Sequence, residues 1–563
     1  MKGSKKHMPA LCRAGLASAL TAFASLQSTA SAGTEDVDIR VDRLFARWDS
    51  NVTPGCALAV SRNGRIVQER GYGMANLEHG VRIRPDTVFH IASVSKQFTA
   101  AAIALLILDG RLSADDSIHK YLPEMPQFGR AITVGNLVHH TSGLREHSEL
   151  LALSGWRYYE DLVTTGDAMS VLVKQKSLVF EPGSRYSYSN TNYLLMGEIV
   201  RRVSGKSLRE FTEERIFRPL GMQRSHFRDR FSEVVRDFAS GYGVDGDTFY
   251  TSLTQFSTVG YSSLLTTVGD LMKWEENFHT GAVGGKRFLE LMETRVPLND
   301  GKPNKYAYGI VVDEYRGLPV VEHEGGDAGY AAHLMRFPKQ HLSVAVLCNV
   351  NTADPRQLAM RTAEIHLGLE PEPARSARPA SIAAIQVPAR ELQTRTGRYL
   401  NRDTELAVQV EFRDGKLHVR TGGQERELVP LARDRYTTSE GRWTLDFPKR
   451  KGIPERVTLH SLYDPSQVLE RVPDFDPKGD ALAAYAGTYH SDEIEAPFHI
   501  RVVDGHLVLR SIKIEFRLMP VTESLFLADW GNLAFDRDAG GRIAGFRYGS
   551  KEWPLTYFKR SGD

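Results

Sequence analysis

The chain has 563 residues, of which 41% are hydrophobic and 25% charged, a composition typical of a soluble protein with roughly two to four domains. Its formal net charge is +2, and residues 1–32 contribute four positive charges and no negative one. Without that segment the net charge is −2, which excludes the basic footprint expected of a nucleic-acid-binding protein.

The first 32 residues have the pattern of a secretory signal. Positive residues precede an apolar or small-residue run from Ala14 to Leu26, and Ala30-Ser31-Ala32 matches the small-x-small cleavage pattern. A membrane anchor is the alternative, but the run is shorter than the ~20 residues that span a bilayer. We expect cleavage before Gly33 and a periplasmic or secreted protein without a transmembrane segment.

Residues 33–369 combine strand-like and helix-like patterns. Two apolar arms around a turn predict a β-hairpin over residues 56–67, and a buried helix is predicted over residues 89–110. Helical periodicity then recurs, and an amphipathic helix is predicted over residues 354–368. Between these helices, strands are predicted over residues 308–313, 318–323, 333–337 and 342–350. Strands at both ends of the segment predict an α+β domain with one antiparallel sheet, flanking helices and a helical insertion.

Two cysteines remain after the signal, Cys56 and Cys348, each in a strand-like apolar run. In an exported protein they could pair, but two buried thiols are at least as good an interpretation. Their spacing matches no zinc site, and the histidines include no metallo-hydrolase motif. We expect neither a metal nor a cofactor.

The composition shifts to Pro, Ala and Arg in residues 370–390, which predicts a linker. Beyond it, Gly397-Arg398-Tyr399 recurs 90 residues later as Gly487-Thr488-Tyr489, and a strand pair around an Asp-Gly turn recurs at the same offset. Two tandem modules are therefore expected, over residues 391–476 and 477–563, each a small antiparallel barrel or sandwich. Neither module contains a residue pattern that indicates catalysis.

The motif Ser93-Val94-Ser95-Lys96 lies near the start of the predicted helix over residues 89–110. Residues three apart share a helix face, and an apolar setting disfavours an ammonium, so Lys96 could accept the proton of Ser93. A second Ser-x-x-Lys, at Ser117 and Lys120, lies in a polar stretch and is interpreted as a solvated turn.

Two further clusters carry polar groups. In the first, Tyr188 and Asn190 are two residues apart on an extended loop and point the same way, so they could move a proton and orient an amine. In the second, His323-Glu324-Gly325-Gly326 ends a strand with side-chain-free backbone along which a ligand could lie. Each cluster alone would fit an ordinary capped turn.

Together the motifs SVSK, YSN and HEG resemble those of the penicillin-recognising serine hydrolases, which include class C β-lactamases, DD-carboxypeptidases, D-aminopeptidases and esterases. The resemblance covers about residues 40–368. It implies that Ser93 is the nucleophile, Lys96 its base, Tyr188 the proton donor to the leaving group and Asn190 the residue that orients Lys96. It further implies an oxyanion hole formed by the backbone N–H groups of Ser93 and Gly326, next to Gly325.

His323 stands where most β-lactamases of the family carry a lysine, as in the esterase and D-aminopeptidase branches. A histidine is only partly charged near neutral pH, so efficient β-lactamase activity is not expected. The tandem modules resemble the plan of bacterial D-aminopeptidases, but residues 525–536 leave room only for a tight hairpin where those enzymes carry a long loop.

These observations predict an exported serine hydrolase that cleaves amide or ester bonds of small molecules or short peptides through a Ser93 acyl-enzyme. D-amino-acid peptides, their amides and simple esters are the expected substrates. The alternative is a catalytically weak penicillin-binding or sensor protein that binds through the tandem modules. A Ser-His-Asp α/β-hydrolase is disfavoured, because the chain has no Gly-x-Ser-x-Gly motif.

Overall fold

An antiparallel sheet of six strands, in the order β10-β11-β12-β13-β1-β2, organises the first part of the chain. The computed structural model describes residues 37–157, 159–369, 385–421, 424–438, 443–449, 452–461, 466–528, 531–550 and 554–561. The expected signal and most of the expected linker lie outside these residues. The sheet strands are β1 (Cys56–Arg62), β2 (Arg65–Tyr72), β10 (Val311–Tyr315), β11 (Leu318–Asp327), β12 (Tyr330–Phe337) and β13 (Leu342–Cys348).

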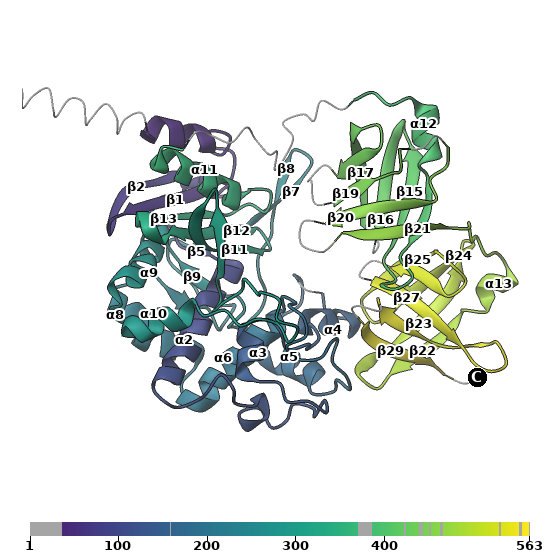
Figure 1. Ribbon diagram of the computed structural model, residues 1–563, viewed down its shortest axis with the longest axis horizontal. Helices are drawn as coiled ribbons and strands as arrows, with labels where there is room; N and C mark the ends of the chain where they lie inside the picture. Colours follow the sequence, from purple (N-terminus) through teal and green to yellow (C-terminus); the bar gives the residue numbers. More distant parts are fainter. Residues whose placement is uncertain are drawn as a thin grey trace, which may run out of the picture.

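The sheet joins the two ends of the domain, as predicted, because β1 pairs along its whole length with β13. Side chains alternate between its two faces: Leu58 and Val60 pack toward α11 (Pro355–Leu367), whereas Ala57 and Ala59 belong to the core on the opposite face. Figure 1 shows α11 on one side of the sheet and α9 (Val268–Thr280) on the other. A helix over residues 37–45 precedes β1. Other helices of the domain are α2 (Lys96–Leu108), α3 (Val134–Val138), α4 (His147–Leu153), α5 (Thr165–Leu172), α6 (Asn190–Ser204), α7 (Leu208–Thr212), α8 (Arg218–Leu220) and α10 (Gly285–Met292), with the 3₁₀ turns η1 (Ala92–Ser95), η2 (Ile118–Lys120) and η4 (Pro338–Gln340) and the π-helical turn η3 (Glu213–Phe217).

The helix predicted over residues 89–110 begins later than expected, at Lys96. Phe89 and His90 instead form a short strand, β5, that pairs with β9 (Leu264–Thr266), and Ala92 has a positive φ of 47°. A residue with that φ cannot continue a right-handed helix, so the helix does not extend back to residue 89. Ser93 lies in the 3₁₀ turn η1, in which the Lys96 backbone N–H donates to the Ser93 carbonyl oxygen, rather than in α2. Strand β6 (His226–Phe227) completes the sheet of β5 and β9 on the other edge of β9, and two further small sheets pair β3 (Met74–Asn76) with β4 (Val81–Arg82) and β7 (Tyr242–Asp245) with β8 (Thr248–Thr251).

Each tandem module forms a closed antiparallel barrel of eight strands rather than a sandwich. Closure pairs the first and last strands of each barrel, which removes the exposed sheet edges. The first barrel contains β14 (Gly397–Leu400), β15 (Ala407–Arg413), β16 (Lys416–Thr421), β17 (Gln424–Ala432), β18 (Arg435–Thr438), β19 (Trp443–Asp446), β20 (Arg456–Ser461) and β21 (Gln467–Val472), preceded by α12 (Ala389–Thr394). The second contains β22 (Gly487–Ser491), β23 (Ile494–Val503), β24 (His506–Arg510), β25 (Glu515–Pro520), β26 (Leu525–Ala528), β27 (Gly531–Arg537), β28 (Ile543–Gly549) and β29 (Pro554–Arg560), preceded by α13 (Asp480–Ala483).

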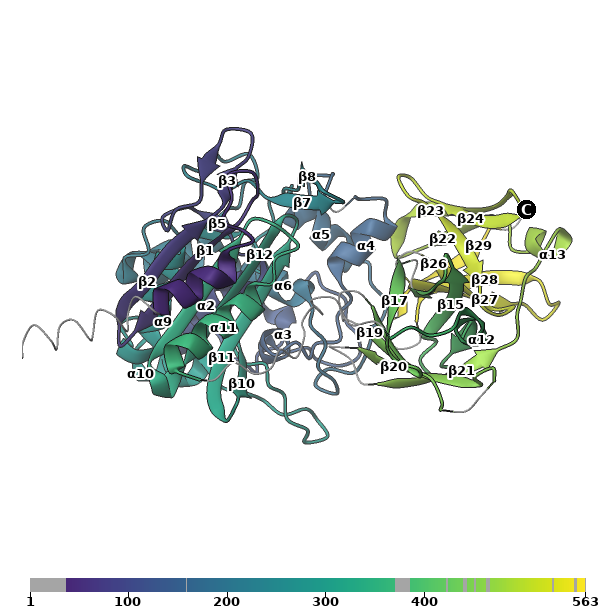
Figure 2. The ribbon, with the colours of Figure 1, turned by 90° about the horizontal axis from the view of Figure 1, so that it is seen from above.

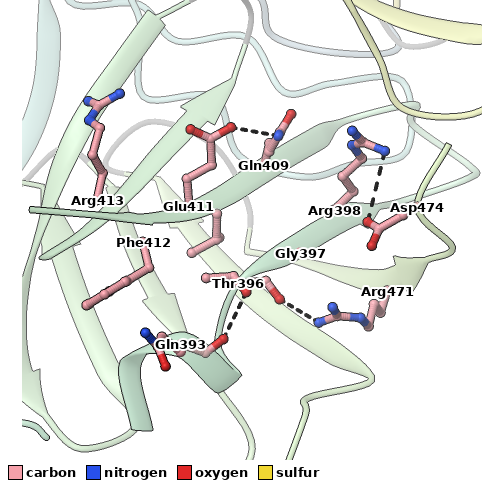
Figure 3. A pocket seen from close by; sticks show the side chains of 11 residues that line it. Gln393, Thr396, Gly397, Arg398, Gln409, Glu411, Phe412, Arg413, Arg471 and Asp474 are labelled. Atoms are coloured by element: carbon pink, nitrogen blue, oxygen red, sulfur yellow. Dashed lines mark hydrogen bonds and ion pairs between the residues drawn. The ribbon is translucent and has the colours of Figure 1, made fainter. Parts of the chain in front are cut away.

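An open cavity of about 580 Å³ lies on the first barrel beside α12 (Figure 3). Its lining is polar, with Arg398 and Arg471 already hydrogen-bonded to backbone carbonyl groups. It contains none of the residues predicted to be catalytic.

A disulfide joins Cys56 to Cys348, which face each other directly across the β1–β13 pair. Of the two interpretations left open by the sequence, the structure therefore contains the paired form. Because the bond closes a loop with a sequence separation of 292 residues, it restricts the unfolded chain strongly.

We expect the double substitution of Cys56 and Cys348 by serine to lower the free energy of unfolding by about 2–5 kcal/mol. The measurement is denaturant unfolding of the oxidised wild type and the variant, followed by tryptophan fluorescence. Equal midpoints and slopes for the two proteins would show that the bond contributes nothing to stability.

Candidate functional site

The Ser93 hydroxyl and the Lys96 amine lie side by side where η1 leads into α2. Nζ of Lys96 is 3.0 Å from Oγ of Ser93, 2.8 Å from Oδ1 of Asn190 and 2.8 Å from the carbonyl oxygen of Tyr261. The carbonyl and amide oxygens can only accept hydrogen bonds, so they take both N–H groups of a neutral amine. The lone pair of that amine is then left for the proton of the Ser93 hydroxyl.

The surroundings of Lys96 favour the neutral amine. The residue is 0% exposed, and this burial lowers the pKa of Lys96 to about 7, against a smaller opposing attraction from Glu146 and Asp327. Near neutral pH a substantial fraction of Lys96 can therefore accept a proton.

Tyr188 and Asn190 come to the pair from the other side of the site, where a loop enters α6. The pKa of the Tyr188 phenol is raised well above its ordinary value because its hydroxyl group is withdrawn from water, although 41% of the residue is exposed, and the neighbouring Ser93 hydroxyl acts in the opposite direction to a smaller extent. The phenol therefore stays protonated, which suits a proton relay better than a base. Asn190 is the first residue of α6, and its side chain reaches Lys96 as described above.

His323 and the two glycines lie on β11, which contacts η1. A Cβ atom on Gly325 would lie 2.4 Å from the carbonyl oxygen of Ile91 and 3.0 Å from the backbone nitrogen of Ser93, so only glycine allows this approach. Nothing lies within 4 Å of the corresponding position on Gly326. The strand therefore offers open backbone beside the nitrogen of Ser93, as an oxyanion hole requires.

His323 differs from the partly charged residue expected from the sequence. It is 4% exposed, and burial lowers its pKa to about 3, helped by the charge of Lys96. Nδ1 lies 2.6 Å from the Glu324 carbonyl oxygen and must donate to it, so Nε2 accepts from the Tyr306 hydroxyl at 2.9 Å. Both ring nitrogens of His323 are hydrogen-bonded within the protein, and the ring is neutral. It therefore provides no positive charge that could bind a substrate carboxylate.

Three residues of the site lie outside the motifs SVSK, YSN and HEG and were not predicted from the sequence: Tyr261, Tyr306 and Glu146. Tyr261 contributes only its carbonyl oxygen, which no side-chain pattern reveals. Glu146 accepts from the Ser189 hydroxyl at 2.8 Å and from the Asn190 backbone nitrogen at 2.8 Å, so it caps α6. The one signal in the sequence is an acidic residue two positions after the stretch Thr141-Ser142-Gly143-Leu144.

The second Ser-x-x-Lys lies at the surface. Ser117 precedes η2, and the Lys120 side chain is 58% exposed and paired with Asp116 at 3.0 Å. It makes no contact with the site built around Ser93. Within the described ranges, no three His, Cys, Asp or Glu side chains gather in a way that could hold a metal ion.

The comparison with protein families matches residues 41–367 to the β-lactamase family. The chain belongs to the β-lactamase family. This match spans the sheet, the helical region and every residue of the site described above. The barrels lie outside it.

Relatives along nearly the whole chain include D-aminopeptidases. One from Brucella melitensis is 26% identical over 524 residues, covering 88% of this chain and 93% of the relative. One from Gluconobacter oxydans is 26% identical over 532 residues, covering 91% and 96%. The chain is thus a hydrolase of β-lactamase fold with D-aminopeptidase homologues.

Solved structures share this fold. The octameric penicillin-binding protein homologue from Pyrococcus abyssi has a TM-score of 0.53 and 26% sequence identity, covering 80% of this chain and all of that one. SurE has the same TM-score at 21% identity, covering 78% of this chain and 99% of its own. No helix in the described part of this chain is long and apolar enough to cross a membrane.

Proposed function

We propose that this protein is an exported serine hydrolase that cleaves amide or ester bonds through an acyl-enzyme on Ser93. The observation that carries the proposal is the fully buried Lys96 amine, 3.0 Å from the Ser93 hydroxyl, with both of its other partners being oxygens that only accept. This arrangement supports Lys96 as the base and Ser93 as the nucleophile.

The proposed reaction has two stages. The Ser93 proton moves to Lys96 as Oγ attacks the substrate carbonyl carbon, and the N–H groups of Ser93 and Gly326 stabilise the oxyanion, typically by ~3 kcal/mol per donor. Tyr188 passes a proton to the leaving amine or alcohol as its bond to carbon breaks, and the Lys96 ammonium returns a proton to Tyr188, so Lys96 is neutral again. A water molecule then attacks the ester carbon as Lys96 takes one of its protons. The bond from carbon to Oγ breaks, and the proton passes from Lys96 to Oγ, which releases the acid and the free Ser93 hydroxyl.

The neutral His323 bears on the substrate class. The lysine that most β-lactamases carry at this position is a permanent cation suited to a substrate carboxylate, whereas His323 is uncharged and internally bonded. Together with the D-aminopeptidase relatives, this favours substrates without a carboxylate near the scissile bond, such as D-amino-acid amides, small peptides with a free amine, or simple esters. The pairing of Ala528 with Gly531 in a tight hairpin leaves no long loop there to select the amine.

The substrate class is tested by turnover of D- and L-amino-acid amides, D-Ala-D-Ala peptides, short-chain esters and a chromogenic cephalosporin. We expect amides or esters to be cleaved and the cephalosporin to be a poor substrate. Efficient cephalosporin hydrolysis would contradict the assignment.

Two features support export. Residues 1–32 have the pattern of a cleavable signal, and the Cys56–Cys348 disulfide is of a kind that persists in oxidising compartments. Mass spectrometry of the N-terminus after expression in a bacterium tests this directly, with Gly33 expected as the first residue.

The pKa of Lys96 predicts the pH dependence of the reaction. Because the base must be neutral, kcat/KM should rise with pH through about 7 and level off above it, falling about tenfold per unit below. The measurement is a pH–rate profile of ester hydrolysis from pH 5 to 9. A profile that stays flat between pH 5 and 7 would exclude Lys96 as the base.

Asp327 requires a control, because burial raises its pKa to about 7 as well. The variant Asp327→Asn should retain the fall in rate below pH 7 if Lys96 causes it. If the fall in kcat/KM below pH 7 disappears in Asp327→Asn, the titration of Asp327 causes it and not that of Lys96.

A further inference from the structure

The second barrel lies against the catalytic domain beside α4 (Figures 1 and 2), and the turn that leads into β23 supplies acidic residues to this interface. Asp492 pairs with Lys176 at 2.7 Å, and Glu495 pairs with Lys174. The Asp492 and Glu495 side chains are more than 80% exposed, so these two ion pairs contribute little to stability.

The third pair, between Glu493 and Arg145, is buried. Its charged atoms are 2.6 Å apart, and the side chains are only 10% and 4% exposed. Arg145 also donates to Gln175 and Ser177, while Glu493 accepts from the backbone nitrogen of Lys176 at 3.1 Å. Removing the Glu493 charge would leave the Arg145 guanidinium buried without a counter-ion, which a protein tolerates poorly.

Arg145 is the first of three consecutive residues that hold the start of α6. Its carbonyl oxygen accepts from the Thr191 hydroxyl at 2.9 Å, and the backbone nitrogen of His147 donates to the same hydroxyl oxygen at 2.7 Å. Between them, Glu146 caps the helix at Ser189 and Asn190. These bonds fix the backbone from which the Asn190 side chain reaches Lys96.

We propose that Glu493 of the second barrel is a positioning residue for the catalytic site, acting through Arg145, Glu146 and Asn190 on the Lys96 amine. The inference rests on the proposed function of Ser93 and Lys96. In this protein the second barrel therefore acts through the buried ion pair between Glu493 and Arg145, which lies behind the site, and not through a long loop inserted into the site. Its influence falls on the rate of the chemical step rather than on substrate binding.

The test compares Glu493→Gln with Asp492→Asn in the full chain, using a reactive ester. Glu493→Gln keeps the shape and removes the charge, and we expect kcat to fall about tenfold with KM changed by less than about twofold. Asp492→Asn removes the neighbouring exposed charge and should leave both constants unchanged. Equal kcat values for wild type and Glu493→Gln would overturn the proposal.

A double-mutant cycle separates positioning from a general loss of stability. In an Asn190→Ala background the group that Glu493 positions is gone, so Glu493→Gln should change kcat by no more than about twofold. The same tenfold loss in both backgrounds would assign Glu493 a purely structural role and overturn the proposal. Thermal unfolding of each variant verifies that the folded fraction is unchanged.

If Glu493→Gln does not fold, Glu493→Asp retains the charge and shortens the side chain, and the same non-additivity is expected with a smaller loss. Ser93→Ala, measured in parallel, keeps the two proposals distinguishable. Activity that survives in Ser93→Ala defeats the proposed function. Activity that depends on Ser93 but does not change in Glu493→Gln contradicts only the positioning role of Glu493.

Discussion

Replacing Ser93 by alanine should reduce turnover of a reactive ester by a factor of about 10⁴ or more, because the nucleophile is removed and no neighbour can substitute for it. The fold should persist, since Ser93 is half-buried in η1 and the change removes one oxygen atom. The measurement is kcat/KM together with the thermal unfolding midpoint.

The matched control is Ser117→Ala in the surface Ser-x-x-Lys, which should keep full activity. Mass spectrometry of the wild type after a short reaction should find the acyl group on the peptide that contains Ser93. Turnover that survives in the Ser93 variant would refute the mechanism. An acyl adduct without turnover would favour the alternative of a penicillin-binding or sensor protein.

Replacing Lys96 by methionine should lower kcat by a factor of about 10³ or more, while the protein stays folded. Methionine fills a similar volume, but its thioether sulfur is far too weak a base to take the Ser93 proton. Burial of an amine is costly, and its removal offsets the loss of hydrogen bonds to Asn190 and Tyr261. We therefore expect the melting temperature to change by only a few degrees.

The acylation rate, measured by stopped flow with a chromogenic ester, reports directly on the step that Lys96 serves. Lys120→Met provides the control, because that side chain is exposed and paired with Asp116. An acylation rate in Lys96→Met within tenfold of wild type would show that another group removes the Ser93 proton.

Much of the fold follows from local sequence patterns. The hairpin of β1 and β2, helix α11 and the repeated Asp-Gly turns are signalled by residues close together in the chain, such as Asp414-Gly415 and Asp504-Gly505. Closure of each barrel is not local, because it pairs strands from opposite ends of a module. The late start of α2 has the same origin, since Phe89 and His90 pair with residues near position 265.

The candidate site, like the fold, is predictable from the sequence only in part. Motif spacing predicts that Ser93, Lys96, Tyr188, Asn190 and His323 have functional roles, and the structure brings all five together around one amine and one hydroxyl. The Tyr261 carbonyl and the Glu146 cap belong to segments without a motif. The charge state of His323 depends on its burial beside Tyr306. A residue's type does not determine that burial.

The pairing of β1 with β13 constrains the order in which the molecule assembles. Strand β1 leaves the ribosome early, yet the neighbour that covers its second edge follows almost 300 residues later. Until then the edge is an open template for other chains, so a nascent or prematurely terminated polypeptide is prone to aggregate. Recombinant production should therefore benefit from a holding chaperone, and a fragment that stops before Leu342 should be insoluble.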